Sequence, residues 1–271
     1  PVNKKNVLES GLVKAKDSAL IVDYIDIDLP KSALTKQRIL MLDVLANNDW
    51  KRPIYFSGGS FDSAEYLWMK DYLQLDGLVY KLVPIKTAYE GIFEMGRIDS
   101  DLMYDIVKKW EWGNSGEDIY HDPQTRSQGL SFRGNLARLM ETLIEEGKIE
   151  KAKEVIEIAM TNMPVEYFGF YAFVEPFVDG YYKVGETTKA RELFDKLKAI
   201  YQDRLEYYAG LPTDEQYRNI EDILADMEAY RRNIDILIEN RDRDLAQKET
   251  LIFNEYLDKF TQLALCDAIT K

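Results

Sequence analysis

The first 85 residues alternate between short apolar runs and amphipathic stretches. Ile25, Ile27 and Leu29 alternate with Tyr24, Asp26 and Asp28, a period of two that is typical of a half-buried strand. A second run, residues 54–56, is continuously apolar, as expected for a strand inside a sheet. Residues 78–85 predict a third strand.

Helical patterns separate these predicted strands. Ser32 or Thr35 can cap a helix whose apolar face lies within residues 39–48, and a second helical pattern starts at about Ser60. Asp76-Gly77 is a turn signal before the third strand. The order β-α-β-α-β favours a small sheet covered by helices, and right-handed crossovers would make that sheet parallel. The expected fold class is therefore α/β or α+β, with a small mixed or parallel sheet.

Long amphipathic helices are predicted from residue 131 onward. "GKIEKAKEVIEIA", which begins at Gly147, aligns without gaps with "GETTKARELFDKL", which begins at Gly185, at an offset of 38 residues. Two further stretches, residues 213–240 and 244–268, predict long antiparallel helices that cap this region.

The first of these units resembles a tetratricopeptide repeat. The positions that carry the resemblance are Leu136, Leu139, Leu143, Gly147, Ala152 and Pro164. Met140 stands where that repeat usually has a small residue. The second unit keeps Gly185, Ala190 and Phe194 but lacks the closing proline and has four extra residues. The resemblance implies two tetratricopeptide-like hairpins rather than a standard array.

Three regions follow from these patterns. We expect an α/β domain over residues 1–105, an irregular junction over residues 106–130 and an α-helical, tetratricopeptide-like domain over residues 131–271. The middle region is rich in turn-forming and polar residues, which is why the boundary is placed there.

The charge balance argues against nucleic acid as a partner. The chain has 271 residues and a net charge of −13, and residues 131–271 carry 19 Lys and Arg against 28 Asp and Glu. Neither half has the basic field that a phosphate backbone attracts. No run reaches the ~18 apolar residues of a membrane span. The start at Pro1, without an initiator Met or a signal peptide, suggests a piece of a longer protein.

The candidate chemistry is sparse. Cys266 is the only cysteine and His121 the only histidine, which excludes an internal disulfide and a multi-histidine metal site within one chain. They lie in different predicted regions, so a thiol–imidazole pair is not expected. Cys266 lies on an apolar helical face and is predicted to be buried packing. His121 is predicted to be a surface or turn residue.

Two further patterns have a functional and a structural interpretation. The glycine turn at residues 57–60 could offer backbone N–H groups to a phosphate, but it lacks the GxGxxG spacing and the P-loop lysine. Asp62 and Glu65 would repel an anion there, so a tight turn capped by Ser60 is favoured. Asp23, Asp26, Asp28 and Asp43 could hold a hard cation, but a solvated face fits them better. No catalytic residue, cofactor site or metal site is predicted.

Aromatic residues between positions 167 and 182 are the best interaction candidates. Phe170, Phe173, Phe177 and Tyr181 fall on one helical stripe and are predicted to be core. Tyr167, Tyr171 and Tyr182 lie off that stripe. They either pack internally or line a groove where helical repeats bind an extended partner.

"LDVLANNDWKRPIYFSGG" followed by "YLQLDGLVYKLVPIK" resembles the C-terminal region of a family of bacterial multi-pass membrane proteins of unknown function. That family is similar to the protein O-mannosyltransferases. The motif positions are Trp50, Arg52, Pro53, Tyr55, Leu75, Gly77, Tyr80 and Pro84. A looser match continues through "RGNLARLMETLIEEGKIEKAKEVI".

The resemblance implies that membrane helices, and the transferase chemistry with them, precede this chain. No catalytic residue carries over. Trp50 and Tyr55 are interpreted as packing anchors, Pro53 as the start of a strand and Gly77 as a turn. Arg52 is predicted to pair with a carboxylate such as Asp43 or to face the membrane-domain site.

The expected function is that of a non-catalytic accessory domain of a membrane glycosyltransferase-like protein, on its extracytoplasmic (periplasmic) face. It would bind an acceptor polypeptide or a partner protein in the helical groove, or brace the membrane domain. The candidate partner-binding residues are Arg52, Tyr167, Tyr171 and Tyr182. The alternatives are a self-contained carbohydrate-active enzyme and a helical-repeat interaction scaffold.

Overall fold

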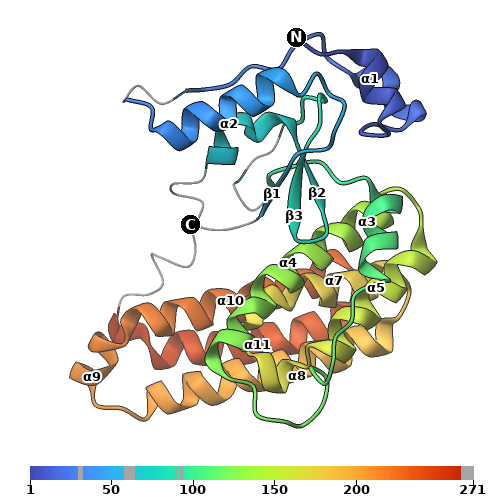
Figure 1. Ribbon diagram of the computed structural model, residues 1–271. Coiled ribbons are helices and arrows are strands. Elements are labelled where there is room, and N and C mark those ends of the chain that lie inside the picture. Colours follow the sequence, from blue (N-terminus) through green and yellow to red (C-terminus); the bar gives the residue numbers. More distant parts are fainter. Residues whose placement is uncertain (30–32, 58–64, 89–90, 92–93, 264–271) are drawn as a thin grey trace. The chain divides into compact units, whose positions relative to one another are not determined.

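The computed structural model describes residues 1–29, 33–57, 65–88, 91 and 94–263 (Figure 1). The chain forms two compact units, Pro1–Glu111 and Trp112–Lys271. The first unit contains a small three-stranded sheet, and the described part of the second contains helices only. The fold class is therefore α+β, with helices as the main element.

The sheet of the first unit is antiparallel throughout. It consists of β1 (Tyr55–Ser57), β2 (Leu73–Asp76) and β3 (Val79–Leu82), in the order β1-β3-β2. Gly77 and Leu78 form a two-residue turn between β2 and β3, and Gly77 has a φ of +70°, which a first turn residue of this hairpin type requires.

The prediction of a parallel sheet is wrong. A parallel crossover needs about a dozen residues, whereas two residues can join only antiparallel neighbours. The apolar run at residues 54–56 is not an interior strand either, because β1 lies at the edge of the sheet. Tyr55 is 50% exposed there, so it is not a packing anchor. Trp50 is one, since its ring is buried and its Nε1 donates to the Pro1 carbonyl at 3.1 Å.

The predicted strand at residues 25–29 does not form. The only ladder contact near it is an isolated antiparallel bridge between Ile21 and Ile85 among the described residues. The burial alternation is nevertheless present in part, because Ile25 and Ile27 pack against the core while Asp26 and Asp28 are exposed. The prediction is wrong for Leu29, which is 48% exposed. Hydrophobic alternation sets which side chains face inward, but a strand also needs a neighbouring backbone with which to pair.

The helical predictions of the first unit are met in part. Thr35 caps α2 (Lys36–Asn47) by accepting from the Arg38 amide at 3.5 Å; Ser32 and Ser60 lie outside the described residues. Instead of one helix up to residue 75, η3 (Glu65–Tyr72) is a 3-10 segment with a kink at Met69, and β2 follows it directly. The remaining elements of this unit are α1 (Lys4–Glu9), η1 (Ala15–Leu20) and α3 (Ser100–Val107).

The second unit is built from helices that pack mainly on their neighbours in sequence. They are α4 (Pro123–Glu145), α5 (Ile149–Asn162), α6 (Val165–Phe168), η5 (Tyr171–Phe173), α7 (Glu175–Lys183), α8 (Thr187–Ala209), α9 (Thr213–Arg218), α10 (Ile220–Glu239), α11 (Arg243–Lys259) and η6 (Thr261–Leu263). The helices α4 and α5 form one hairpin and α7 and α8 a second.

Two of the predicted long helices have different bounds. The stretch 213–240 is broken at Asn219 into α9 and α10, and α11 ends at Lys259. Cys266 lies outside the described residues. The turns of the two hairpins contain Gly147 and Gly185, with φ values of +72° and +84°.

Candidate functional site

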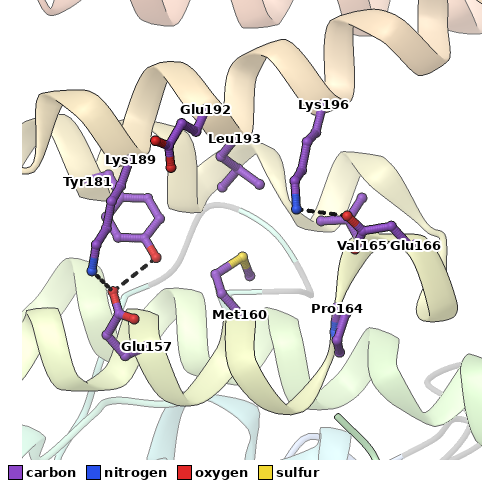
Figure 2. Close-up of a pocket in the computed structure, with 10 residues that line it drawn as sticks. All are labelled: Glu157, Met160, Pro164, Val165, Glu166, Tyr181, Lys189, Glu192, Leu193 and Lys196. Carbon is purple, nitrogen blue, oxygen red and sulfur yellow. Dashed lines mark hydrogen bonds and ion pairs between the residues drawn. The ribbon is translucent and has the colours of Figure 1, made fainter. Parts of the chain in front are cut away.

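A cleft of about 260 Å³ opens in the second unit between α5, α6 and α8 (Figure 2). Its lining residues are Glu157, Met160, Pro164, Val165, Glu166, Tyr181, Lys189, Glu192, Leu193 and Lys196. Met160 of α5 forms its floor, Val165 of α6 and Leu193 of α8 add apolar side chains, and charged side chains from the same helices also line it. Pro164 follows Met163, the C-cap of α5, and is itself the N-cap of α6, which forms one wall.

Two ion pairs span this cleft. The Lys189 ammonium lies 2.7 Å from Oε1 of Glu157, and the Lys196 ammonium lies 2.7 Å from Oε1 of Glu166. All four side chains are about half exposed. Exposed pairs of this kind contribute about 0.2–1 kcal/mol each, so they can open for a ligand at small cost.

Hydrogen bonding shifts the pKa values of Glu166 and Lys189 at the cleft. The hydrogen bond from Lys196 lowers the pKa of Glu166, and the hydrogen bond to Glu157 raises the pKa of Lys189. Burial, helped by the charge of Glu157, raises the pKa of Tyr181, whose hydroxyl donates to Oε1 of Glu157 at 3.1 Å. These groups are therefore held in their ordinary protonation states at neutral pH, which suits binding rather than proton transfer.

The candidate residues Tyr167, Tyr171 and Tyr182 do not line the cleft. Tyr167 stacks on the His121 ring at 5.5 Å, and Tyr171 meets Tyr201 edge-on at 6.3 Å. The Tyr182 hydroxyl donates to Oδ2 of Asp242 at 2.7 Å. All three are half-buried, and each makes an internal contact.

The predicted aromatic stripe is only partly a core stripe. Phe177 and Tyr181 are buried, as expected, but Phe170 is 43% exposed and does not lie on a helix. Its φ of +50° places it in the left-handed region between α6 and η5, directly after Gly169. The helical periodicity therefore breaks at Gly169. The prediction of one continuous aromatic stripe did not take this glycine into account.

Arg52 is exposed and makes no ion pair with a carboxylate in the described part of the chain. Its carbonyl accepts from Nδ2 of Asn48 at 2.8 Å. The expected partner Asp43 instead accepts from Nδ2 of Asn47 at 3.0 Å. The predicted Arg52–Asp43 pair is therefore wrong, because both side chains lie at exposed positions and the Asp43 carboxylate has a nearer partner in Asn47.

His121 is buried rather than at the surface. Only 8% of it is exposed, and its ring lies against Tyr167 and Phe168, with Nε2 3.2 Å from the Glu117 carbonyl. The loop sequence gave no sign of this, because the aromatic partners are more than forty residues away.

Arg133 is the largest fully buried side chain that the sequence interpretation missed. Its guanidinium donates to the carbonyls of Met163, Pro164 and Gly169, and it lies 5.7 Å from the Phe168 ring. Burial lowers its pKa to about 10. These bonds fix the segment that carries Pro164, Val165 and Glu166, and hence one wall of the cleft.

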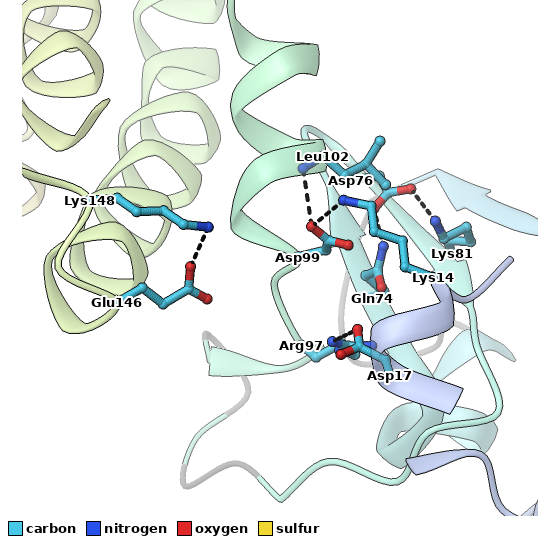
Figure 3. Close-up of polar contacts among 10 residues, drawn as sticks. All are labelled: Lys14, Asp17, Gln74, Asp76, Lys81, Arg97, Asp99, Leu102, Glu146 and Lys148. Carbon is cyan, nitrogen blue, oxygen red and sulfur yellow. Dashed lines mark hydrogen bonds and ion pairs between the residues drawn. The ribbon is translucent and has the colours of Figure 1, made fainter. Parts of the chain in front are cut away.

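A second polar cluster lies in the first unit (Figure 3). Lys81 and Asp76 form a buried ion pair at 2.9 Å, and Nε2 of Gln74 donates to Oδ1 of Asp76 at 2.7 Å. Burial, together with the charge of Asp76, raises the pKa of Tyr55.

Two further ion pairs lie in the same unit, Lys14–Asp99 at 2.9 Å and Arg97–Asp17 at 2.8 Å. Every charge of the cluster has a partner of opposite sign, so the arrangement suits a structural role that fixes the strand register.

The described residues contain no group of three or more His, Cys, Asp or Glu side chains that could hold a metal ion. The aspartates at positions 23, 26, 28 and 43 therefore do not gather into a cation site. The turn at residues 57–60 lies outside the described residues except for Ser57. None of the helices in the described ranges is long and apolar enough to cross a membrane.

Comparison with known proteins gives one match. Residues 1–102 match the family model described as TMEM260-associated domain 2. This part of the chain thus fits a membrane-protein-associated domain family, which supports the expected resemblance at that coarser level only. No curated protein and no solved structure matches the chain.

Proposed function

We propose that this chain is a non-catalytic accessory module of a membrane glycosyltransferase-like protein, similar to the protein O-mannosyltransferases, on its extracytoplasmic face. In this role it binds a polypeptide segment, from an acceptor or a partner protein, through the second unit. The observation that carries the proposal is the cleft between α5, α6 and α8, which is lined by both apolar and charged side chains. A site of that kind suits recognition of a side chain from another chain.

The tetratricopeptide-like interpretation of the two hairpins is part of this proposal. It is supported by Ala152 and Ala190, which are fully buried at equivalent positions of α5 and α8. Turn residues Gly147 and Gly185 both have positive φ. Helical-repeat proteins of this type commonly bind extended polypeptides.

The attachment to a membrane protein is supported by the match of residues 1–102 to TMEM260-associated domain 2. The open reading frame upstream of Pro1 tests it. We expect several apolar spans of about twenty residues there. A start codon immediately before Pro1, with no such span, would remove this part of the proposal.

Binding of a polypeptide can be tested by photo-crosslinking in the complete protein. Met160 on the cleft floor is replaced by p-benzoylphenylalanine, whose excited ketone inserts into nearby C–H bonds. We expect covalent polypeptide adducts, identified by mass spectrometry as defined segments. The control places the same residue at Asp235, an exposed position of α10 away from the cleft.

The outcomes separate the alternatives. Polypeptide adducts from position 160 and not from 235 support the proposal. Adducts from position 160 that are glycans or glycolipids instead would favour a carbohydrate-active site. Equal labelling from both positions would show that the cleft has no binding role.

A further inference from the structure

The charges at the cleft do not balance. Glu157, Glu166 and Glu192 bring three carboxylates, whereas Lys189 and Lys196 bring two ammonium groups. Each lysine is already paired, with Glu157 and Glu166 respectively. Among the residues that the structure describes, Glu192 makes no ion pair, and Figure 2 shows no contact drawn from its carboxylate. The cleft therefore carries one unmatched negative charge.

Apolar side chains reach this cleft from three helices, α5, α6 and α8. Met160, Val165 and Leu193 contribute aliphatic or thioether surface, and the Tyr181 ring closes one side. The volume of about 260 Å³ is enough for one long side chain but not for a folded element. The cleft thus places apolar side chains beside a carboxylate that has no ion-pair partner.

We propose that this cleft takes a lysine or arginine side chain of the bound polypeptide, with its aliphatic stem on Met160 and Leu193 and its cationic head at Glu192. Only these two side chains combine a long apolar stem with a terminal positive charge. Arginine binds more tightly, because its guanidinium can donate two parallel hydrogen bonds to one carboxylate. This inference rests on the proposed function and names the chemistry of the segment that the module recognises.

Other occupants are disfavoured on physical grounds. A purely apolar side chain would remove water from Glu192 without supplying a hydrogen bond, which costs free energy. An acidic side chain would be repelled by Glu192 and would find both lysines of the cleft already paired with Glu157 and Glu166. The net charge of −9 over residues 131–271, from 19 basic and 28 acidic residues, adds a long-range attraction for basic segments.

The inference is tested with small probes and amide NMR on the chain of residues 1–271. The probes are N-acetyl-arginine methylamide, the lysine analogue, the norleucine analogue and the glutamate analogue. Norleucine has the lysine stem without the charge, so it isolates the contribution of the cationic head. We expect affinity to decrease in the order arginine, lysine, norleucine, glutamate. The largest amide chemical-shift changes should occur at residues 157–166 and 189–196.

Two variants of equal charge change serve as the matched pair. Glu192→Gln should lower the affinity for the arginine probe about three- to fivefold, as expected for the loss of one partly exposed ion pair. It should leave the affinity for the norleucine probe unchanged. Asp203→Asn, at an exposed position of the same helix outside the cleft, should change neither of these two affinities. The arginine affinity should also fall between low and high salt.

The result that overturns this inference differs from the one that overturns the proposed function. If arginine and norleucine bind equally, and Glu192→Gln has no effect, the basic-residue inference fails while polypeptide binding at the cleft stands. If no probe shifts the cleft amides and position 160 yields no polypeptide adduct, both fail.

Discussion

Met140 and Gly180 show how one residue makes room for another. Met140 lies fully buried on α4, at a position that tetratricopeptide repeats usually keep small, and Gly180 lies opposite it on α7. A Cβ atom added at Gly180 would approach the Met140 sulfur and its methyl group at clashing distances. The large residue on one helix is therefore tolerated because the facing residue has no side chain.

Gly180→Ala is expected to lower the free energy of unfolding by about 1–3 kcal/mol, because it overpacks this contact. Chemical denaturation measures the change. In a Met140→Ala background the same substitution should cost much less, since the clashing sulfur is absent. Gly134→Ala is the control, because its added Cβ meets Phe173 only at an ordinary 3.6 Å; we expect it to stabilise by about 0.5–1 kcal/mol. Equal losses in both backgrounds would contradict this packing account.

At the scale of elements, α8 is held by cations that pair with buried carboxylates. Arg191 binds Asp242 through Nε at 2.7 Å and Nη2 at 2.9 Å, and Lys198 lies 3.2 Å from Oε1 of Glu249. Glu249 is fully buried and also accepts from the Tyr230 hydroxyl at 2.8 Å. These contacts join α8 to α11 and to Asp242, which directly precedes α11.

Asp226 on α10 is the exception in this set. Nε of Arg204 lies 2.9 Å from its Oδ2, yet that oxygen accepts no hydrogen bond in the described structure. Burial raises the pKa of Asp226 to about 6, against the attraction of Arg204 and with a further increase from Asp222. The carboxylate form is thus poorly stabilised where α8 and α10 pack.

A pH dependence follows from this raised pKa. The folded protein binds the Asp226 proton more tightly than the unfolded chain does, whose pKa is near 3.8. The stabilising contribution is therefore complete below about pH 4 and is lost as the pH rises through about 6. Asp226→Asn should remove this loss and be more stable than wild type at pH 7 by on the order of 1–3 kcal/mol. The lower value applies if solvent screens the charge of Asp226, as the partly exposed Arg204 beside it allows.

Denaturation at several pH values between 4 and 8 measures this difference. Asp235→Asn, an exposed substitution on the same helix, should leave the wild-type profile in place. A wild-type stability that rises through this range relative to Asp226→Asn would show that Asp226 is stabilised as the anion.

At the scale of the whole molecule, each unit has a hydrophobic core of its own. The core of the first unit includes Val7, Leu12, Val13, Ile21, Trp50, Met69, Tyr72, Leu82, Val83 and Ile85. The second unit buries Leu136, Phe177, Phe194 and Tyr230 among many others. A region with its own core and mostly internal contacts meets the requirement for independent folding.

Residues 112–271 alone should therefore fold. We expect a helical circular dichroism spectrum and one cooperative thermal transition. In the chain of residues 1–271, Gly180→Ala should lower the midpoint temperature of the second unit's transition. The midpoint temperature of the first unit's transition should not change. A chain of residues 112–271 that is unfolded in isolation would show that the second unit depends on the first.

Local chemistry determined several features from the sequence by itself. Thr35 caps α2, Gly77 turns β2 into β3, and the inward-facing positions of Ile25 and Ile27 follow from a period of two. The helical character of the second unit, with turns at Gly147 and Gly185, follows from local periodicity and backbone freedom. Each depends on residues within a few positions of one another, so a linear pattern contains the necessary information.

Only the tertiary structure decided which segments meet. The antiparallel order β1-β3-β2, the internal partners of Tyr167, Tyr171 and Tyr182, and the burial of His121 and Arg133 all depend on contacts between residues far apart in the chain. The cleft was missed for the same reason. The spacing of Lys189, Leu193 and Lys196 places them on one face of α8, but their partners Glu157 and Glu166 come from α5 and α6. The pattern of hydrophobic and charged residues determines which side chains share a face of a helix. The packing of the helices determines which other side chains that face contacts.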